Sequence, residues 1–176
     1  IIAVFAPVIA PYDPKEMIAS YLPPSREHLL GTNDVGQDIF SEMVYGTRVS
    51  LYIGIFAAFI VTGVGTVLAL VSGYFGGVTD KIITAITNIA MAVPSLPLTV
   101  LLVAYLNPGK WSLIIAISVT AWTGTARILR SRVMQLKELP FIKIEKTMGV
   151  HPVVILFKHI LPNIKDIILT RGAMAI

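Results

Sequence analysis

The spacing of the charged residues constrains the fold of this chain more than any other feature. No charge occurs between Arg48 and Asp80, between Lys81 and Lys110, or between Lys110 and Arg127. A bilayer core about 30 Å thick is crossed by a helix of roughly 20 apolar residues. The first two intervals exceed that length and the third falls just short of it. Since a soluble core rarely buries three such segments in succession, the sequence predicts an all-α, multi-pass transmembrane helical bundle.

Composition supports a membrane protein over a nucleic-acid-binding one. Charged residues make up 14% of the chain, against about 25% in an average soluble domain. The net charge of +4 is concentrated in one segment beside an apolar stretch, so we expect a lipid bilayer and no nucleic acid as partner. The chain has no cysteine, which excludes disulfides and thiolate metal sites.

Three spans are predicted, over residues 50–75, 82–106 and 112–133, with a tight loop at 76–81. Pro94 and Pro97 interrupt the second span, and a proline inside a helix removes a backbone hydrogen bond and kinks it. The kink, with Ser95, is a candidate lining of a translocation path, and a packing role is an equal alternative. Arginines in the last turns of the third span are expected to reach headgroups or water.

The distribution of basic residues predicts the orientation in the membrane. Seven basic residues lie from Arg127 to Lys158, opposed only by Glu138 and Glu145. The positive-inside rule therefore predicts that 127–158 is cytoplasmic. The loop at 76–81 is then cytoplasmic too, while 107–110 and the polar connection at 11–47, which could hold a short helix at 36–45, face outside.

A short helix is predicted inside the basic segment, in the loop 138–151. Pro140 suits the first position of a helix and Gly149 the position just past its end. Phe141, Ile144 and Met148 then share one face. Such an apolar stripe fits a groove on a partner protein or the membrane surface, and spacing alone does not separate the two.

Catalytic and metal-binding chemistry has no support in the sequence. His28, His151 and His159 are scattered, and we expect none to have a partner nearby, so no catalytic, cofactor or metal residue is assigned. A phosphate-binding loop is missing, because Gly109-Lys110 is followed by Trp111 rather than Ser or Thr. The three predicted spans also contain no carboxylate or histidine, the groups that ion-coupled transporters commonly use.

The stretch from Gly149 to Asn163 resembles the cytoplasmic loop of binding-protein-dependent ABC importer permeases. The family pattern is written as Glu-Ala-Ala, three residues, Gly, nine residues, then an apolar residue and Pro; Gly149 fits it, and Leu161-Pro162 stand two positions after the place of its last part. The three positions of Glu-Ala-Ala are occupied by Lys143, Ile144 and Glu145, which do not match. The resemblance implies an ATPase-coupling loop, whose candidate residues are Phe141, Lys143, Ile144, Glu145, Met148, Gly149 and Pro162.

Further stretches resemble the dipeptide, oligopeptide and nickel subgroup of these permeases. Residues 30–38 and 45–51 are similar to its outer signature, with Gln37 in place of the usual arginine. Residues 73–77, 94–96 and 122–127 also match. The candidate outer-signature residues are Gly31, Thr32, Asp34, Gly36, Asp38 and Arg48. The resemblance implies the second of two related permeases, with about six helices, so 1–176 is expected to be one permease domain that is incomplete at both ends.

This resemblance implies a transporter subunit of the cell membrane rather than an enzyme. Its expected partners are cytoplasmic ATP-binding cassette ATPase subunits that carry the ATP and magnesium, a sister permease that completes a heterodimer, and an extracytoplasmic substrate-binding protein. The chain itself is expected to bind no cofactor. Peptides are the leading substrate, with nickel or oligosaccharides as alternatives. A different class, an ion channel or secondary transporter that works without an ATPase, is the alternative function.

Overall fold

The computed structural model describes residues 2–176, and this part of the chain is helical apart from loops and one isolated bridge between Thr32 and Asp38. The predicted all-α fold is confirmed. The chain divides into two compact units, one up to Ile53 and the other Gly54–Ile176. Helix α2, Ile39–Phe75, runs through the division, and the two units are described separately below.

The first unit is mostly irregular. It contains the short helix α1, Ala6–Ile9, a polar segment of turns, and the beginning of α2. The helix considered for 36–45 is present from Ile39 on, but it is the start of α2, which continues without a break, and not a separate short helix. The polar connection therefore ends earlier than predicted, at Asp38. The 37 residues of α2 correspond to about 56 Å of helix, well beyond the thickness of a bilayer core.

The connection between α2 and the next helix is shorter than the predicted loop at 76–81. Helix α3, Gly77–Ala92, begins one residue after Gly76. Gly76 and Gly77 have φ of +66° and +57°, a region that residues with a Cβ rarely adopt. Two consecutive glycines therefore reverse the chain without a longer loop, and Asp80 lies in the first turn of α3.

The second predicted span is broken into two helices, α3 and α4, Ser95–Tyr105, which are bent by 84°. Pro94 has no N–H to continue α3, and a residue before proline is driven out of the helical region. Val93 accordingly has ψ of 126°. Pro97 lies in the first turn of α4, where a missing N–H costs no hydrogen bond, so Pro94 alone accounts for the break.

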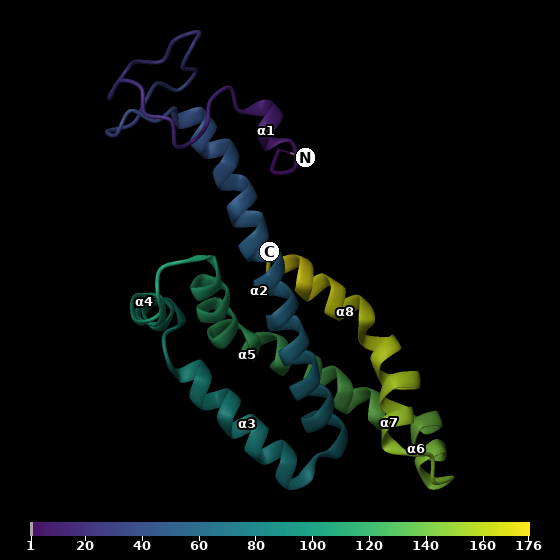
Figure 1. The fold of residues 1–176 in the computed structure, drawn as a ribbon. Coiled ribbons are helices and arrows are strands. Elements are labelled where there is room, and N and C mark those ends of the chain that lie inside the picture. The colour runs from purple at the N-terminus through teal and green to yellow at the C-terminus, as the bar shows by residue number, and fades with distance from the viewer. Residues whose placement is uncertain (1) are drawn as a thin grey trace. The chain divides into compact units, whose positions relative to one another are not determined.

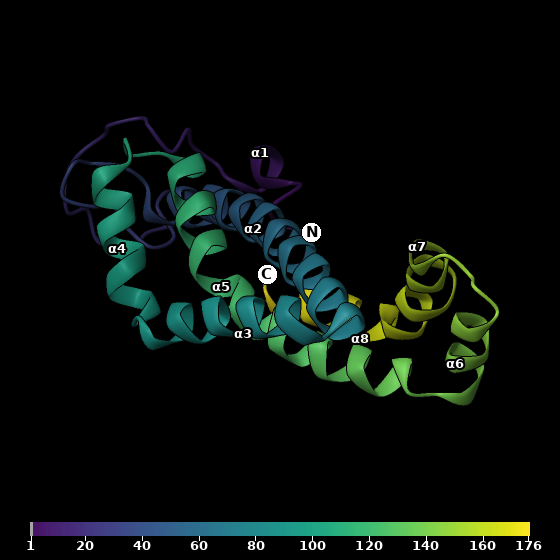
Figure 2. The ribbon, with the colours of Figure 1, turned by 90° about the horizontal axis from the view of Figure 1, so that it is seen from below.

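Two helices are long and apolar enough to cross a membrane, α2 and α5, Lys110–Lys137, and α3 with α4 would form a third crossing if the bent pair is one span. After α5 come the short helices α6, Pro140–Thr147, and α7, Pro152–Ile155, then a π-helical turn η1, Leu156–Ile160, and α8, Leu161–Met174. In the second unit α5 lies between α4 on one side and α8 on the other (Figures 1 and 2).

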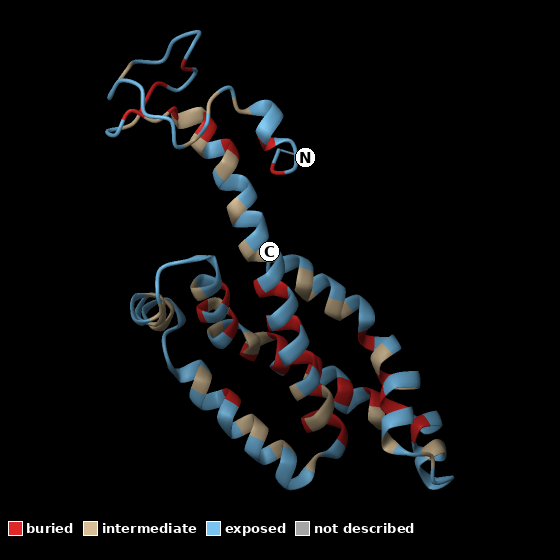
Figure 3. Ribbon diagram, viewed as in Figure 1, coloured by how far each residue is buried: buried red, intermediate tan, exposed pale blue. Residues whose placement is uncertain are grey.

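The core of the second unit lies where α5 meets the short helices, at one end of the bundle. Its buried residues come from six helices, so the elements after α5 are packed onto the bundle rather than hanging free. Figure 3 shows buried positions following α2 and α5, while α3 and α4 are largely exposed. The cluster consists of Ala69, Tyr74, Leu129, Val133, Leu136, Ile142, Ile155, Leu156, Ile160 and Ile164.

Away from this core, the helices expose large apolar side chains and bury some small polar ones. Phe59 and Leu96 are 80% and 77% exposed, which suits lipid rather than water. Buried positions include the hydroxyls of Thr66, Ser72 and Thr87, which donate to carbonyls four residues earlier in their own helices. Small polar residues of this kind are typical of contacts between membrane helices.

Helices α2 and α5 approach each other most closely at two glycines. A Cβ on Gly65 would lie 2.8 Å from the Thr125 side chain, and one on Gly73 would lie 2.8 Å from the Val133 side chain and 3.1 Å from the Arg130 carbonyl. The two distances of 2.8 Å are shorter than those of real Cβ contacts, and 3.1 Å is tighter than most of them. The two helices can therefore pack as they do only because both positions lack a side chain.

We predict that Gly73→Ala destabilises the folded chain by about 1–3 kcal/mol, the cost of overpacking a close contact. The matched control is Gly63→Ala in the same helix, where a Cβ would meet no atom within 4 Å. That variant should be neutral or slightly stabilising, because alanine favours a helix over glycine. Thermal unfolding in detergent measures both variants, and equal midpoints would contradict the packing described here.

Candidate functional site

Helix α6 has defined ends that match the sequence prediction. Pro140 is at its start, after Leu139 in an extended conformation. Gly149 follows its end with φ of +77°. The Gly149 amide donates to the Lys146 carbonyl over 3.2 Å and the Val150 amide donates to the Glu145 carbonyl over 3.1 Å. These two bonds form a Schellman motif, so the predicted helix and its glycine stop are confirmed.

Helix α6 has one apolar residue in the core and three outside it. Ile142 is 2% exposed and belongs to the core cluster. Phe141, Ile144 and Met148 are 44%, 59% and 76% exposed. We call these three residues the apolar stripe. Ile142 holds α6 against the bundle, so the apolar stripe has a fixed position relative to the bundle.

Two histidines have acidic partners, so the expectation that none would is wrong. His159 Nε2 lies 2.8 Å from Glu145 Oε1 and joins η1 to α6. The other carboxylate oxygen of Glu145 is buried without a hydrogen-bond partner in the described chain. The Phe141 ring lies edge-on to the His159 ring, with centroids 6.2 Å apart. In the first unit, His28 Nδ1 lies 3.0 Å from Asp38 Oδ1.

A basic hollow lies between the end of α5 and α6. It has a volume of about 180 Å³ and is lined by Tyr74, Phe75, Lys137, Glu138, Ile142, Lys143 and Lys146. Glu138 pairs with Lys143 over 2.9 Å, and both side chains are exposed. The hydrogen bond from Lys143 lowers the pKa of Glu138 below its ordinary value. Three lysines and one glutamate line the hollow, so it carries net positive charge beside the apolar stripe.

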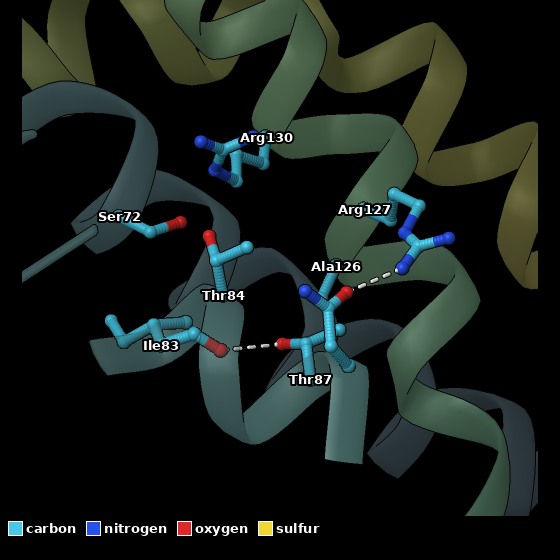
Figure 4. A pocket seen from close by; sticks show the side chains of 8 residues that line it. Ser72, Ile83, Thr84, Thr87, Ala126, Arg127 and Arg130 are labelled. Carbon is cyan, nitrogen blue, oxygen red and sulfur yellow. Dashed lines mark hydrogen bonds between the residues drawn. The ribbon is translucent and has the colours of Figure 1, made fainter. Parts of the chain in front are cut away.

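Polar contacts tie α5 to α3, where Figure 4 shows the side chains around a small pocket. Arg130 Nε and Nη2 donate to the two carboxylate oxygens of Asp80 over 2.5 and 2.6 Å. Arg127 Nη2 donates to Asn88 Oδ1 over 2.7 Å. Arg127 remains exposed, as expected for an arginine that reaches headgroups or water, whereas Arg130 is half-buried and held by its carboxylate partner on α3.

The expectation that the spans contain no carboxylate depended on their predicted bounds. With the bounds of the structure, α3 includes Asp80 and α2 includes Glu42. Asp80 is matched by the bidentate contact with Arg130, the strongest form of charged hydrogen bond in proteins. The contact of Arg130 with Asp80 completes a series of contacts that runs from α6, through α5, to α3.

The break between α3 and α4 borders a hollow of about 530 Å³. Pro94 and Ser95, two of the predicted path residues, line it, and Pro97 is not among its lining residues. Thr99 and Thr120 also line the hollow, and their Oγ1 atoms are 3.3 Å apart. The structure thus brings two of the three predicted path residues to a cavity with hydroxyl groups in its wall.

Five of the six outer-signature residues lie in the turn before α2, and Arg48 lies inside α2. Asp38 is 1% exposed, and its Oδ2 accepts from the amide of Ser41, the third residue of α2, which is the geometry of a helix N-cap. Burial raises the pKa of Asp38, but hydrogen bonds from Ser41 and His28 outweigh it, and the net pKa is lowered. Thr32 Oγ1 accepts from the Leu22 amide and donates to the Ala19 carbonyl.

Two glycines and two charged residues complete the outer signature. Gly31 has φ of +75°, and a Cβ there would lie 2.3 Å from the Leu22 carbonyl oxygen. Gly36 has φ of +85° and packs on the backbone of Ile18. Asp34 and Arg48 are exposed. Four of the six residues therefore have a structural role in the turn, and two are available to a partner.

The arrangement of the second unit defines a class of protein: a helical membrane component with a broken span, α3 and α4, and a group of short helices after α5. Residues 65–176, more than half of the chain, match the family described as binding-protein-dependent transport system inner membrane component. The chain belongs to this family. As a member, it is an inner-membrane component of a transport system.

Individual relatives agree with this family. The chain is 38% identical to the oligopeptide transport system permease protein OppC of Bacillus subtilis, over the whole chain and 58% of that protein. It is 40% identical to the dipeptide permease protein DppC of Alkalihalophilus pseudofirmus, over 93% of the chain and 54% of that protein. It is 37% identical to the glutathione permease protein GsiD of Pectobacterium atrosepticum, over 80% and 46%. The chain spans about half the length of these curated relatives.

We predict that Asp80→Asn destabilises the second unit by about 2 kcal/mol, because Arg130 then keeps its charge without a carboxylate partner. The double variant Asp80→Arg/Arg130→Asp should recover part of the loss. Glu138→Gln, which removes the exposed pair with Lys143, should have no measurable effect. Unfolding in detergent compares the variants. A loss for Glu138→Gln as large as that for Asp80→Asn would contradict this assignment.

A pH dependence is predicted for the start of α2. The folded-state pKa of Asp38 lies below its ordinary value, which is about 3.9 in an unfolded chain. Its contacts therefore stabilise the turn fully above about pH 4, and this stabilisation is lost as pH falls through the folded-state pKa. Hydrogen exchange of the Ser41 amide, corrected for intrinsic rates, should show this loss.

The same measurement on two variants checks the origin of the effect. Asp38→Asn should abolish the pH dependence of the Ser41 amide and lower its protection at neutral pH. Asp34→Asn removes an exposed carboxylate four residues earlier and should leave both unchanged. If Asp38→Asn kept the wild-type pH profile, the stabilising contact would have to lie elsewhere.

Proposed function

We propose that this chain is the permease subunit of an ATP-binding cassette importer for peptides, and that α6 couples it to a cytoplasmic ATPase. The observation that carries this proposal is the apolar stripe, three exposed apolar residues on a short helix anchored by Ile142. A helix with one apolar face suits a groove on a partner protein. The surplus of basic residues around it supports a cytoplasmic position for 127–158.

The route from α6 into the bundle is continuous. Ile142 packs with residues of α5, α7 and α8 in the core cluster. The pair of Glu145 with His159 links α6 to η1, which leads into α8. Arg130 and Arg127 then link α5 to α3. A displacement of α6 by the ATPase would therefore move α5 directly, α8 through α7 and η1, and α3 through the two arginines.

The translocation pathway is proposed to run beside the break between α3 and α4. Pro94 and Ser95 line a cavity there, whose volume of about 530 Å³ is within the range of about 300–1,000 Å³ for ligand sites. A sister permease would complete the pathway. An extracytoplasmic binding protein would dock on the outer side, where Asp34 and Arg48 are exposed. ATP and magnesium would be bound by the ATPase subunits.

Peptides are the substrate class that the relatives support. The printed names of the similar permeases refer to oligopeptide, dipeptide and glutathione transport. Within the described residues, no group of three or more His, Cys, Asp or Glu side chains could hold a metal ion.

We predict that Ile144→Asp lowers co-purification of the ATPase subunits with the assembled transporter at least about tenfold. Placing a carboxylate in an apolar contact costs more than the 1.4 kcal/mol that corresponds to this factor. The control is Thr147→Asp, which introduces the same charge at an exposed position of α6 outside the apolar stripe. It should retain the ATPase.

Two results would overturn the coupling proposal. One is full retention of the ATPase by Ile144→Asp together with unchanged peptide uptake and ATP hydrolysis. The other is labelling of an introduced cysteine at Thr147 only from the extracytoplasmic side of sealed vesicles, which would place α6 on the wrong side of the membrane. Residues 1–176 contain no cysteine, so the same vesicles without the introduced cysteine give the background for this labelling.

A further inference from the structure

We propose that the basic hollow between the end of α5 and α6 binds a phosphate ester, and that its ligand is the headgroup of an anionic phospholipid. Lipid headgroups and free phosphates of the cytoplasm share this chemistry. The inference goes beyond the proposed function, because it concerns a lipid and requires no contact of the chain with an ATPase. The volume of about 180 Å³ is large enough to admit a group of several heavy atoms.

Three lysines from two helices meet at the basic hollow. Lys137 is the last residue of α5, and Lys143 and Lys146 are in α6. All three line the hollow. The pKa of Glu138 is lowered first by the hydrogen bond from Lys143, and the charges of all three lysines lower it further. The three ammonium groups are therefore close enough to one another to act on a single anion.

The acids of the hollow do not balance these lysines. Glu138 is the one acidic side chain among its lining residues, and it is engaged by Lys143 over 2.9 Å. No ion pair of the described chain includes Lys137 or Lys146. Two positive charges are therefore left without a paired carboxylate. A phosphate has several oxygens on one centre, so it can accept from both.

The ammonium of Lys137 is positioned by the end of α2. A Cβ on Gly76 would lie 3.4 Å from Lys137 Nζ, so the ammonium lies against the turn between α2 and α3. Its charge also acts on Asp80 of α3, but Arg130 already binds both oxygens of that carboxylate. Lys137 is half-buried beside a carboxylate that is already matched, and its charge remains available to an anion in the hollow.

The place of the hollow in the fold favours a lipid over a free phosphate. Its wall includes Tyr74 and Phe75, the last two residues of α2. Helix α2 carries no charge after Arg48, so its apolar part extends to this end, and a tyrosine there is typical of the headgroup level. Phe75 is 55% exposed, which offers an apolar contact to an acyl chain. Basic pockets between membrane helices bind anionic headgroups in this way.

A ligand in the basic hollow would not compete with a partner on the apolar stripe. Ile142 lines the hollow, whereas the residues of the apolar stripe do not. At 100° per residue, Lys146 is roughly 150° around α6 from each of them. A bound phosphate would therefore join α6 to the ends of α2 and α5 on the side that faces the bundle, and would hold α6 while a partner contacts the stripe.

Photocrosslinking tests which lipid occupies this position. p-Benzoylphenylalanine replaces Phe75, or Phe59, which is 80% exposed in the same helix and does not line the hollow. The full-length chain, with the subunits that it retains, is placed in vesicles of equal parts dioleoyl phosphatidylglycerol and dioleoyl phosphatidylcholine. The ratio of phosphatidylglycerol to phosphatidylcholine adducts should be about tenfold higher at Phe75, because each lysine strengthens binding of an anionic lipid several-fold. Equal ratios would overturn the proposal.

Charge variants test the role of the lysines. Lys137→Gln/Lys146→Gln should lower the ratio at Phe75 to that of the control position, while the yield at the control position stays unchanged and shows that the variant is folded and inserted. Lys158→Gln/Lys165→Gln removes two exposed lysines outside the hollow and should retain the high ratio. If both double variants lowered the ratio equally, or neither did, the assignment to the hollow would be wrong.

Other anions give different results. Millimolar inorganic phosphate at constant ionic strength should leave the ratio at Phe75 unchanged; if it abolishes the preference, the ligand is a free phosphate and the lipid assignment is overturned. If acidic residues of an ATPase pair with the lysines instead, Lys137→Gln/Lys146→Gln will reduce the ATPase that co-purifies and leave the adduct ratio unchanged, which also overturns the proposal. The adducts form without ATPase or uptake, so failure of the proposed function leaves this test intact.

Discussion

The close contact between α2 and α5 determines how the second unit is assembled. Within a bilayer the hydrophobic effect does not drive helices together, so they associate through close packing and polar contacts. Gly65 and Gly73 allow the backbone of α2 to approach Thr125 and Val133 of α5. With α5 held in this way, the residues on its other sides are fixed in direction. Arg127 and Arg130 meet α3, Gly124 meets Arg171, and Leu136 enters the core that supports α6.

This arrangement separates two kinds of surface. The apolar side chains exposed on α2, α3 and α4 suit contact with lipid, whereas the apolar stripe lies on a short helix with lysines around it. The stripe is held in place by a core of its own and by the pair of Glu145 with His159. A helix supported so firmly transmits force in both directions. An ATPase bound to it would act on the bundle, and a substrate held in the bundle would act on the ATPase.

Local signals in the sequence were sufficient to predict the number of apolar segments and the ends of α6. Pro140 and Gly149 act through the conformation of their own backbone, and so does Pro94, which breaks the second span. Helix ends without such a signal were placed less well. The polar residues after Asp38 do not stop α2, and two glycines made the loop after it shorter than predicted.

Contacts across long separations in the chain could not be predicted. Arg130 and Asp80 are 50 residues apart, and their pairing depends on the bend between helices and on the register of α3 against α5. The pair of Glu145 with His159 could not be predicted either, because it depends on how η1 packs against α6. Charge in a predicted span was nevertheless a usable signal, because an ionisable group in lipid needs a partner. Applied to Arg130, this reasoning would have directed attention to Asp80.

The π-helical turn η1 has a consequence for evolution in this part of the chain. Such a turn holds one residue more than an α-helical turn, and it directly precedes Pro162, whose ring would crowd the carbonyl of Lys158 in a regular helix. A five-residue π-helical turn rotates the chain about as far as four residues of α-helix. Loss of a single residue in 156–160 would therefore convert the turn to an α-helix and leave the side chains of α8 facing nearly the same neighbours. Loss of one residue from the regular part of α8 would instead rotate everything after it by about 100°. The π-helical turn is therefore the place in this segment where the chain tolerates a change of one residue in length.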